Sequence, residues 1–98
     1  MEVHFELHGL SFVWDNAKAA VNPREHDGIT FEQAATVFFD PFFRMVDASR
    51  HGESRDVVIG LDAVGRLLFV VHIERDGEFI RLISARKATS QERTDHDS

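Results

Sequence analysis

Hydrophobic and polar residues alternate with a period of two in several parts of this 98-residue chain, and each such part predicts a β-strand. In the first of them, Val3, Phe5 and Leu7 alternate with histidine and glutamate. The pair Asp76-Gly77 is typical of a two-residue hairpin turn and joins the last two strands. The predicted strands cover residues 3–8, 11–14, 45–46, 55–61, 66–74 and 78–85.

Two helices are predicted between the second and third strands. Asp15 is a good N-cap for the alanine-rich stretch that follows it. Pro23 is expected to end or kink this helix near Asn22, because proline removes a backbone donor and clashes with the preceding turn. Thr30 and Gln33 form a T-x-x-Q capping box, which predicts the start of a second helix.

A further capping box, Thr89 with Glu92, predicts a short C-terminal helix that frays into a flexible tail over residues 94–98. Strands and helices occur in separate runs, which indicates the α+β class. We expect an antiparallel sheet of about four strands, with two N-terminal helices packed on one face and the short C-terminal helix at the end. The length fits a single domain over residues 1–98.

The predicted turn at Asp76-Gly77 fixes which residues of the last two strands lie opposite each other. Residues whose numbers sum to 153 are then paired, so His72 faces Arg81. One face of this hairpin is nearly all apolar, and we expect the helices to cover it: Leu67, Phe69, Val71, Ile73, Ile80, Leu82 and Ser84. The other face is expected to be open and to bring together Arg66, His72, Glu74 and Arg81. Its simplest interpretation is a solvated surface on which Arg81 pairs with Glu74.

Charge and composition limit the possible functions. Seventeen acidic residues against eleven basic ones give a net charge of −6, which speaks against a general binder of nucleic acids or anionic membranes. The charge is uneven, however: residues 1–40 hold seven acidic and two basic residues, net −5, whereas residues 80–93 hold four basic and one acidic residue, net +3. A phosphate group is the natural partner of the positive segment, since guanidinium groups bind phosphate with two hydrogen bonds.

Other classes of protein lose support. The chain has no cysteine, which excludes disulfides, thiolate zinc sites and a cysteine nucleophile. Neither a signal peptide nor a long apolar span is present, so a cytoplasmic protein without membrane contact is expected. We expect no metal and no cofactor.

The aromatic residues are expected to have structural roles. Trp14 and Phe12 are expected to pack beneath the first helix. Four phenylalanines within six residues, at 38, 39, 42 and 43, predict part of the core together with a hydrophobic patch or protein interface.

Over residues 12–93 the sequence resembles the BrnT toxin family. The most specific part of the resemblance is the ending Ile83-Ser84-Ala85-Arg86-Lys87-Ala88-Thr89 with Glu92-Arg93, which continues the matching residues Ile80-Arg81-Leu82. It also rests on Phe12-Val13-Trp14-Asp15, Lys18, Asn22, His26, Gly28, Thr30-Phe31-Glu32-Gln33-Ala34, Phe38, Asp40, Glu53-Ser54-Arg55, Ile59-Gly60, Gly65-Arg66-Leu67-Leu68 and Val70-Val71-His72. The resemblance implies a RelE-like α+β fold and the toxin half of a type II toxin–antitoxin pair. Such a toxin is a metal-independent ribonuclease that inhibits translation, is held inactive by a ribbon-helix-helix (BrnA-like) antitoxin, and contacts operator DNA only through that antitoxin.

RNA cleavage through the 2′-hydroxyl needs a base, an acid, and cations beside the phosphate. Combined with the resemblance, this chemistry predicts catalytic roles for Arg81, Arg86 and Arg55 at the phosphate, and for His72, Glu53 or Glu74 in proton transfer. The expected RNA-binding residues are Lys87, Arg66 and Arg93, and the expected antitoxin-binding residues are Phe39, Phe42 and Phe43. The alternative is a catalytically weak or inactive interaction module that binds a ribbon-helix-helix antitoxin.

Overall fold

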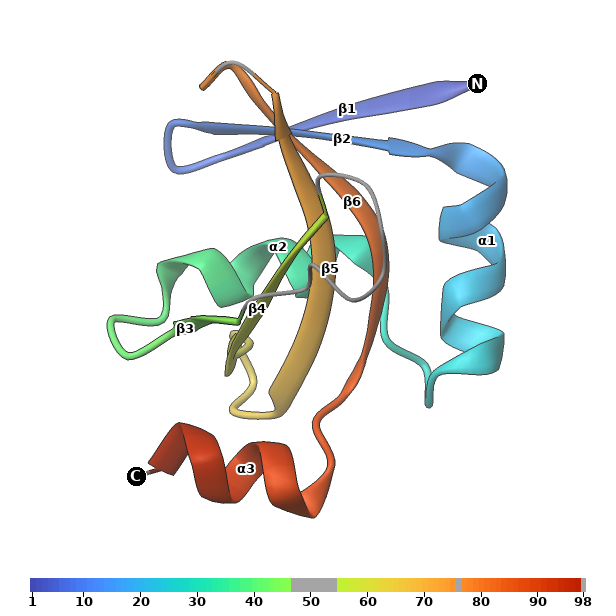
Figure 1. The fold of residues 1–98 in the computed structure, drawn as a ribbon. Helices are drawn as coiled ribbons and strands as arrows, with labels where there is room; N and C mark the ends of the chain where they lie inside the picture. Colours follow the sequence, from blue (N-terminus) through green and yellow to red (C-terminus); the bar gives the residue numbers. More distant parts are fainter. Residues whose placement is uncertain (47–54, 76, 98) are drawn as a thin grey trace.

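The computed structural model describes residues 1–46, 55–75 and 77–97 of the chain. The described residues form six strands, three α-helices and a short 3-10 helix between α2 and β3. Figure 1 shows how these elements are arranged. The elements are β1 (Glu2–Leu7), β2 (Leu10–Asp15), α1 (Asn16–Glu25), α2 (Phe31–Thr36), η1 (Val37–Phe39), β3 (Arg44–Val46), β4 (Asp56–Leu61), β5 (Leu67–Arg75), β6 (Phe79–Lys87) and α3 (Ser90–Asp97).

The six strands form one mixed sheet in the order β1-β2-β6-β5-β4-β3. Neighbouring strands are antiparallel except β2 and β6, which run parallel and pair Phe12 with Ile80. The α+β class is therefore confirmed, whereas the expected sheet of about four antiparallel strands is wrong. The parallel pair joins segments more than sixty residues apart in the chain, and no local pattern reveals such a contact.

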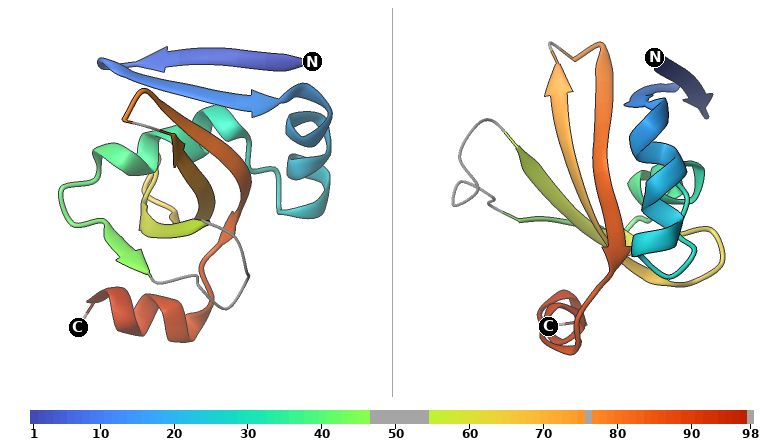
Figure 2. Two further views of the ribbon diagram at one scale, coloured as in Figure 1. Left: turned by 45° about the horizontal axis from the view of Figure 1, so that its top comes forward. Right: turned by 90° about the vertical axis from the view of Figure 1, so that its right-hand side faces the viewer.

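Helices α1 and α2 lie on the same side of the sheet, while α3 lies at the end of the sheet where β6 finishes (Figures 1 and 2). Both predicted capping boxes are present, at Thr30 with Gln33 and at Thr89 with Glu92. The expected end of α1 near Asn22 is wrong, because the helix continues through Pro23. The helix ends at Glu25, two residues later, so Pro23 removes a backbone donor from the last turn only. Helix α3 begins at Ser90 and extends to Asp97, into the segment 94–98 that is predicted to be a flexible tail.

The main core lies between the sheet and the two helices. Trp14 and Phe12 are buried there, but the predicted position beneath the first helix is not what the contacts show: the Trp14 ring meets that of Phe31 of α2 edge-on, with ring centroids 5.6 Å apart, and the Phe12 ring meets that of Phe38 of η1. A smaller apolar cluster, centred on Val57 and Leu67, lies on the opposite face of the sheet. Within the described ranges, no helix is long and apolar enough to cross a lipid bilayer.

The faces of the β5–β6 hairpin differ from the prediction. Arg75 pairs with Phe79, so three residues and not two lie between the paired ends. Farther along, Val71 pairs with Ser84 and His72 with Leu82, which leaves Ile83 as the extra residue of a bulge. Consequently the core side of β5 carries Leu68, Val70 and His72, and the prediction that His72 lies on the open face is wrong.

The side of the sheet opposite α1 and α2 is called the outer face below. On β5 it carries Phe69 and Val71, and on β6 it carries Arg81, Ser84 and Arg86, as the pairing and the strand alternation require. The bulge at Ile83 is what brings both arginines to the same face, because it shifts the alternation between them.

Candidate active site on the outer face

Arg86 is held on the outer face by contacts on three sides. Its guanidinium carbon lies 3.9 Å from the centroid of the Phe69 ring, a cation–π contact. Nη1 and Nη2 donate to the two carboxylate oxygens of Glu92 at 2.8 and 2.9 Å. Nη1 also donates to the backbone oxygen of Lys87 at 3.1 Å. The side chain remains 35% exposed, so the guanidinium is both ordered and accessible.

Arg81 lies nearer the start of β6 than Arg86 does, beside the parallel strand β2. It forms an ion pair with Glu2 of β1, and this hydrogen bond holds the pKa of the Glu2 carboxyl below its ordinary value. The predicted pairing of Arg81 with Glu74 is therefore wrong. Arg81, Glu2, Val13, His4 and Phe79 line an open depression of about 400 Å³.

Arg55 directly precedes β4. Its Nε is buried and its side chain is half-buried overall. The β4–β5 pairing, continued by one residue beyond Asp56 and His72, places Arg55 beside Ile73, and Ile73 is paired with Arg81. The three predicted phosphate-binding arginines thus belong to the outer face. Glu53 lies outside the described residues, and its predicted role stays a prediction.

The two other residues predicted to transfer protons are on the opposite face. His72 is 0% exposed and its ring meets that of Phe38 edge-on at 5.0 Å. Burial lowers the pKa of this imidazole, so it is kept neutral in the core. Glu74 is exposed and pairs with Ile80 on the helix side of the sheet, beside the β1–β2 turn. The expectation that His72 and Arg81 share an open face is wrong.

The residues predicted to bind RNA are dispersed. Arg66 is part of the β4–β5 turn, where its Nε and Nη2 bind the buried carboxylate of Asp62 at 2.9 and 2.8 Å. Lys87 is exposed at the end of β6, and Arg93 is exposed on α3. Lys87 is paired with Leu68 and so belongs, by strand alternation, to the helix side of the sheet, Arg93 lies on α3, and Arg66 stabilises a turn.

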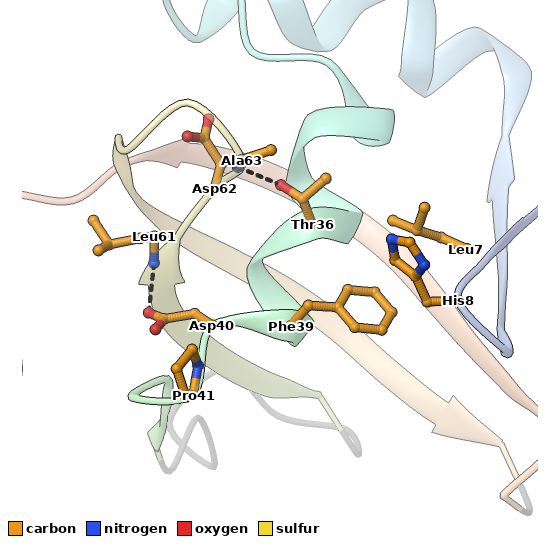
Figure 3. A pocket seen from close by; sticks show the side chains of 9 residues that line it. All are labelled: Leu7, His8, Thr36, Phe39, Asp40, Pro41, Leu61, Asp62 and Ala63. Carbon is orange, nitrogen blue, oxygen red and sulfur yellow. Dashed lines mark hydrogen bonds between the residues drawn. The ribbon is translucent and has the colours of Figure 1, made fainter.

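The phenylalanines of the predicted antitoxin-binding set are exposed, as a protein interface requires. Phe42 is 75% exposed, while Phe39 and Phe43 are about half as exposed; Phe38 packs in the core. Phe39 lines an open pocket of about 570 Å³, shown in Figure 3. Phe42 and Phe43 line a neighbouring depression of about 550 Å³, and both hollows include Leu61.

Three contributors to the outer face were not identified from the sequence: Glu92, Glu2 and Phe69. Glu92 does have a visible signal, since it occupies the N3 position of a capping box, but that signal predicts a helix start and not a partner for Arg86. Glu2 reaches Arg81 only through the parallel pairing of β2 and β6. Among the residues that the structure describes, no three histidine or acidic side chains are grouped as metal ligands.

Comparisons with known proteins bear on the family and the fold of this chain. The sequence model described as "Ribonuclease toxin, BrnT, of type II toxin-antitoxin system" matches residues 14–92. No curated protein matches the sequence. The crystal structure of the Brucella abortus ribonuclease toxin BrnT, at 1.1 Å resolution, is similar in fold, with a TM-score of 0.55 and 20% identity; the match covers 79% of this chain and 94% of the Brucella chain. Because the family model spans most of its length, the chain belongs to the BrnT family of ribonuclease toxins of type II toxin–antitoxin systems.

Proposed function

We propose that this protein is an endoribonuclease toxin that cleaves RNA without a metal ion and binds the scissile phosphate on the outer face of its sheet. The observation that carries this proposal is the placement of Arg81 and Arg86, both from the positive segment 80–93, on the same face of the sheet, opposite α1 and α2. Family membership supplies the reaction class. An arginine that is ordered by neighbours but still exposed is well suited to a phosphate.

The proposed reaction uses the nucleophile that RNA itself carries. The 2′-oxygen attacks phosphorus, its proton passes to a base, and the bond from phosphorus to the 5′-oxygen breaks as that oxygen receives a proton. The products are a 2′,3′-cyclic phosphate and a free 5′-hydroxyl. Negative charge develops on the phosphoryl oxygens during the attack, and guanidinium groups fixed beside them stabilise it. The imidazole of His72 has no route to this phosphate, because it is enclosed on the opposite face.

The direct test is expression of the protein with and without the protein encoded beside it. We expect growth arrest with the protein alone, relief on co-expression, and cleavage of purified RNA with EDTA present. RNA fragments should end in a cyclic phosphate, which mass spectrometry identifies. Growth arrest without RNA cleavage, or cleavage that EDTA abolishes, would contradict the proposal.

We also propose that a ribbon-helix-helix antitoxin binds the exposed phenylalanine surface, defined as Phe39, Phe42 and Phe43 with Leu61. This surface joins two neighbouring hollows, and all four of its apolar side chains are exposed. Exposed aromatic side chains beside hollows are typical anchors of protein interfaces. Family membership implies an antitoxin partner of this protein.

Phe42→Asp is expected to weaken antitoxin binding by at least about tenfold, because it places a charge in an apolar interface and removes an aromatic anchor. Isothermal titration calorimetry with the purified antitoxin measures the change. Val21→Asp is the matched control, since Val21 is also an exposed apolar residue but lies on α1. Equal affinities of the two variants would place the interface elsewhere.

One observation favours the alternative of a binding module without catalysis. Arg81 and Arg86 already have carboxylate partners in Glu2 and Glu92, so RNA must either displace these partners or use the remaining donors. A stable toxin–antitoxin complex together with a free protein that cleaves no RNA would establish this alternative.

A further inference from the structure

The hydrogen-bonding capacity of Arg86 is divided between two edges of its guanidinium group. The edge formed by Nη1 and Nη2 is occupied, since both atoms donate to Glu92. The other edge consists of Nε–H and the second hydrogen of Nη2, and no described residue accepts from Nε. A guanidinium can bind one oxyanion on each edge, so the pairing with Glu92 leaves a second bidentate site.

Glu92 is itself fixed in place. Its Oε1 accepts from the backbone N–H of Thr89 at 2.8 Å, and its own N–H donates to Thr89 Oγ1 at 3.2 Å. These two bonds form the capping box that starts α3. The capping box therefore orients the Glu92 carboxylate independently of its contact with Arg86. The hydrogen bond with Arg86 holds the pKa of Glu92 below its ordinary value.

From these contacts, and resting on the proposed function of Arg86, we infer that Glu92 is a positioning residue that turns the free Nε edge of Arg86 toward the scissile phosphate. Phe69 supports one face of the guanidinium and Glu92 restrains rotation in its plane. Arginine normally loses considerable rotamer freedom on binding, and restraint in advance reduces that loss. The carboxylate acts through Arg86 and does not contact RNA.

Glu92→Gln tests the inference, because glutamine at N3 also completes a capping box but carries no charge. We expect kcat for RNA cleavage to fall about tenfold, with KM unchanged or lower, since positioning matters most in the transition state. Glu32→Gln is the matched control: it causes the same change in net charge on the exposed surface of α2, far along the chain from Arg86. In an Arg86→Ala background, Glu92→Gln should have no further effect.

Two additional measurements separate positioning from simple support of α3. Thr89→Ala removes a capping hydroxyl but leaves the carboxylate, so kcat should stay near wild type. Nitrogen-15 NMR of the Arg86 side chain should show slowed rotation of its Nη groups in the wild type and faster rotation in Glu92→Gln. Titration with inorganic phosphate should shift the Nε signal in the wild type and less in the variant.

Several results would overturn the inference. The first is a Glu92→Gln variant whose kcat equals or exceeds that of Glu32→Gln. The second is a Thr89→Ala variant that loses as much kcat as Glu92→Gln does. The third is a loss on Glu92→Gln substitution that is as large in the Arg86→Ala background as in the wild type. Wild-type protein that cleaves no RNA would instead refute the proposed function. The phosphate titration then decides whether Glu92 orients Arg86 toward an oxyanion.

Discussion

Arg86→Ala is expected to reduce the rate of RNA cleavage by about 100-fold or more, the usual cost of removing one fixed donor to an oxyanion. The loss should be large because this side chain is the one arranged by three independent contacts, with Phe69, Glu92 and the Lys87 carbonyl. Single-turnover cleavage with excess protein and EDTA measures the chemical step directly. Arg86→Lys should recover only part of the rate, since an ammonium group cannot bind phosphate through a planar fork.

Lys87→Ala is the matched control for Arg86, because it removes the same charge from the next residue of the same strand. Lys87 is exposed at the end of β6. Its loss should weaken RNA binding a few-fold and make binding less sensitive to salt, without a change in the chemical step. If Arg86→Ala folds and cleaves as fast as Lys87→Ala, Arg86 has no catalytic role.

Much of the local structure could be predicted from the sequence, because the signals involved are local. Both capping boxes form as the T-x-x-Q and T-x-x-E patterns indicate. Strands β1 and β4 lie close to their predicted ranges. The parallel pairing of β2 with β6 depends instead on contacts between the two ends of the chain, and it makes the sheet mixed.

The faces of β5 could not be predicted, because this strand is apolar on both sides. Leu67, Phe69 and Val71 pack in the small cluster, while Leu68 and Val70 belong to the main core. Because apolar residues occur on both faces, their alternation does not show which face is buried, and the polar His72 suggested the wrong one. A turn that is one residue longer shifts the pairing by one residue, which reverses the faces of β5 relative to those of β6. An unrecognised third turn residue is therefore sufficient to cause this error.

The candidate site shows the same division between local and distant information. The arginines of the outer face were identified from charge and family resemblance, and the bulge at Ile83 gives Arg81 and Arg86 a common direction that the sequence does not reveal. Their carboxylate partners come from β1 and α3, at opposite ends of the chain. The uneven charge therefore has a structural basis: part of the acidic surplus neutralises the arginines that are expected to meet RNA.

Asn22→Ala is expected to lower the free energy of unfolding by about 3 kcal/mol or more, because it leaves three buried backbone groups without partners. Asn22 is 5% exposed on α1. Its Nδ2 donates to the backbone oxygens of Ile29 and Ala85 at 2.8 and 2.9 Å, and its Oδ1 accepts from the Ala85 N–H at 3.2 Å. One side chain thus joins α1, the loop before α2, and the strand that carries Arg86.

Chemical denaturation monitored by circular dichroism measures this loss, which is a large share of the roughly 5–15 kcal/mol that stabilises a typical domain. Asn16→Ala is the matched control: it makes the same substitution at the exposed start of the same helix, and it should change stability by less than about 0.5 kcal/mol. Equal stabilities of the two variants would show that the Asn22 amide does not hold α1 against β6.

Because Ala85 immediately precedes Arg86 and follows the bulge, a partly folded Asn22→Ala protein should also lose RNA cleavage before it loses helix content. Cleavage that persists until the helices unfold would mean that the outer face keeps its geometry without this amide.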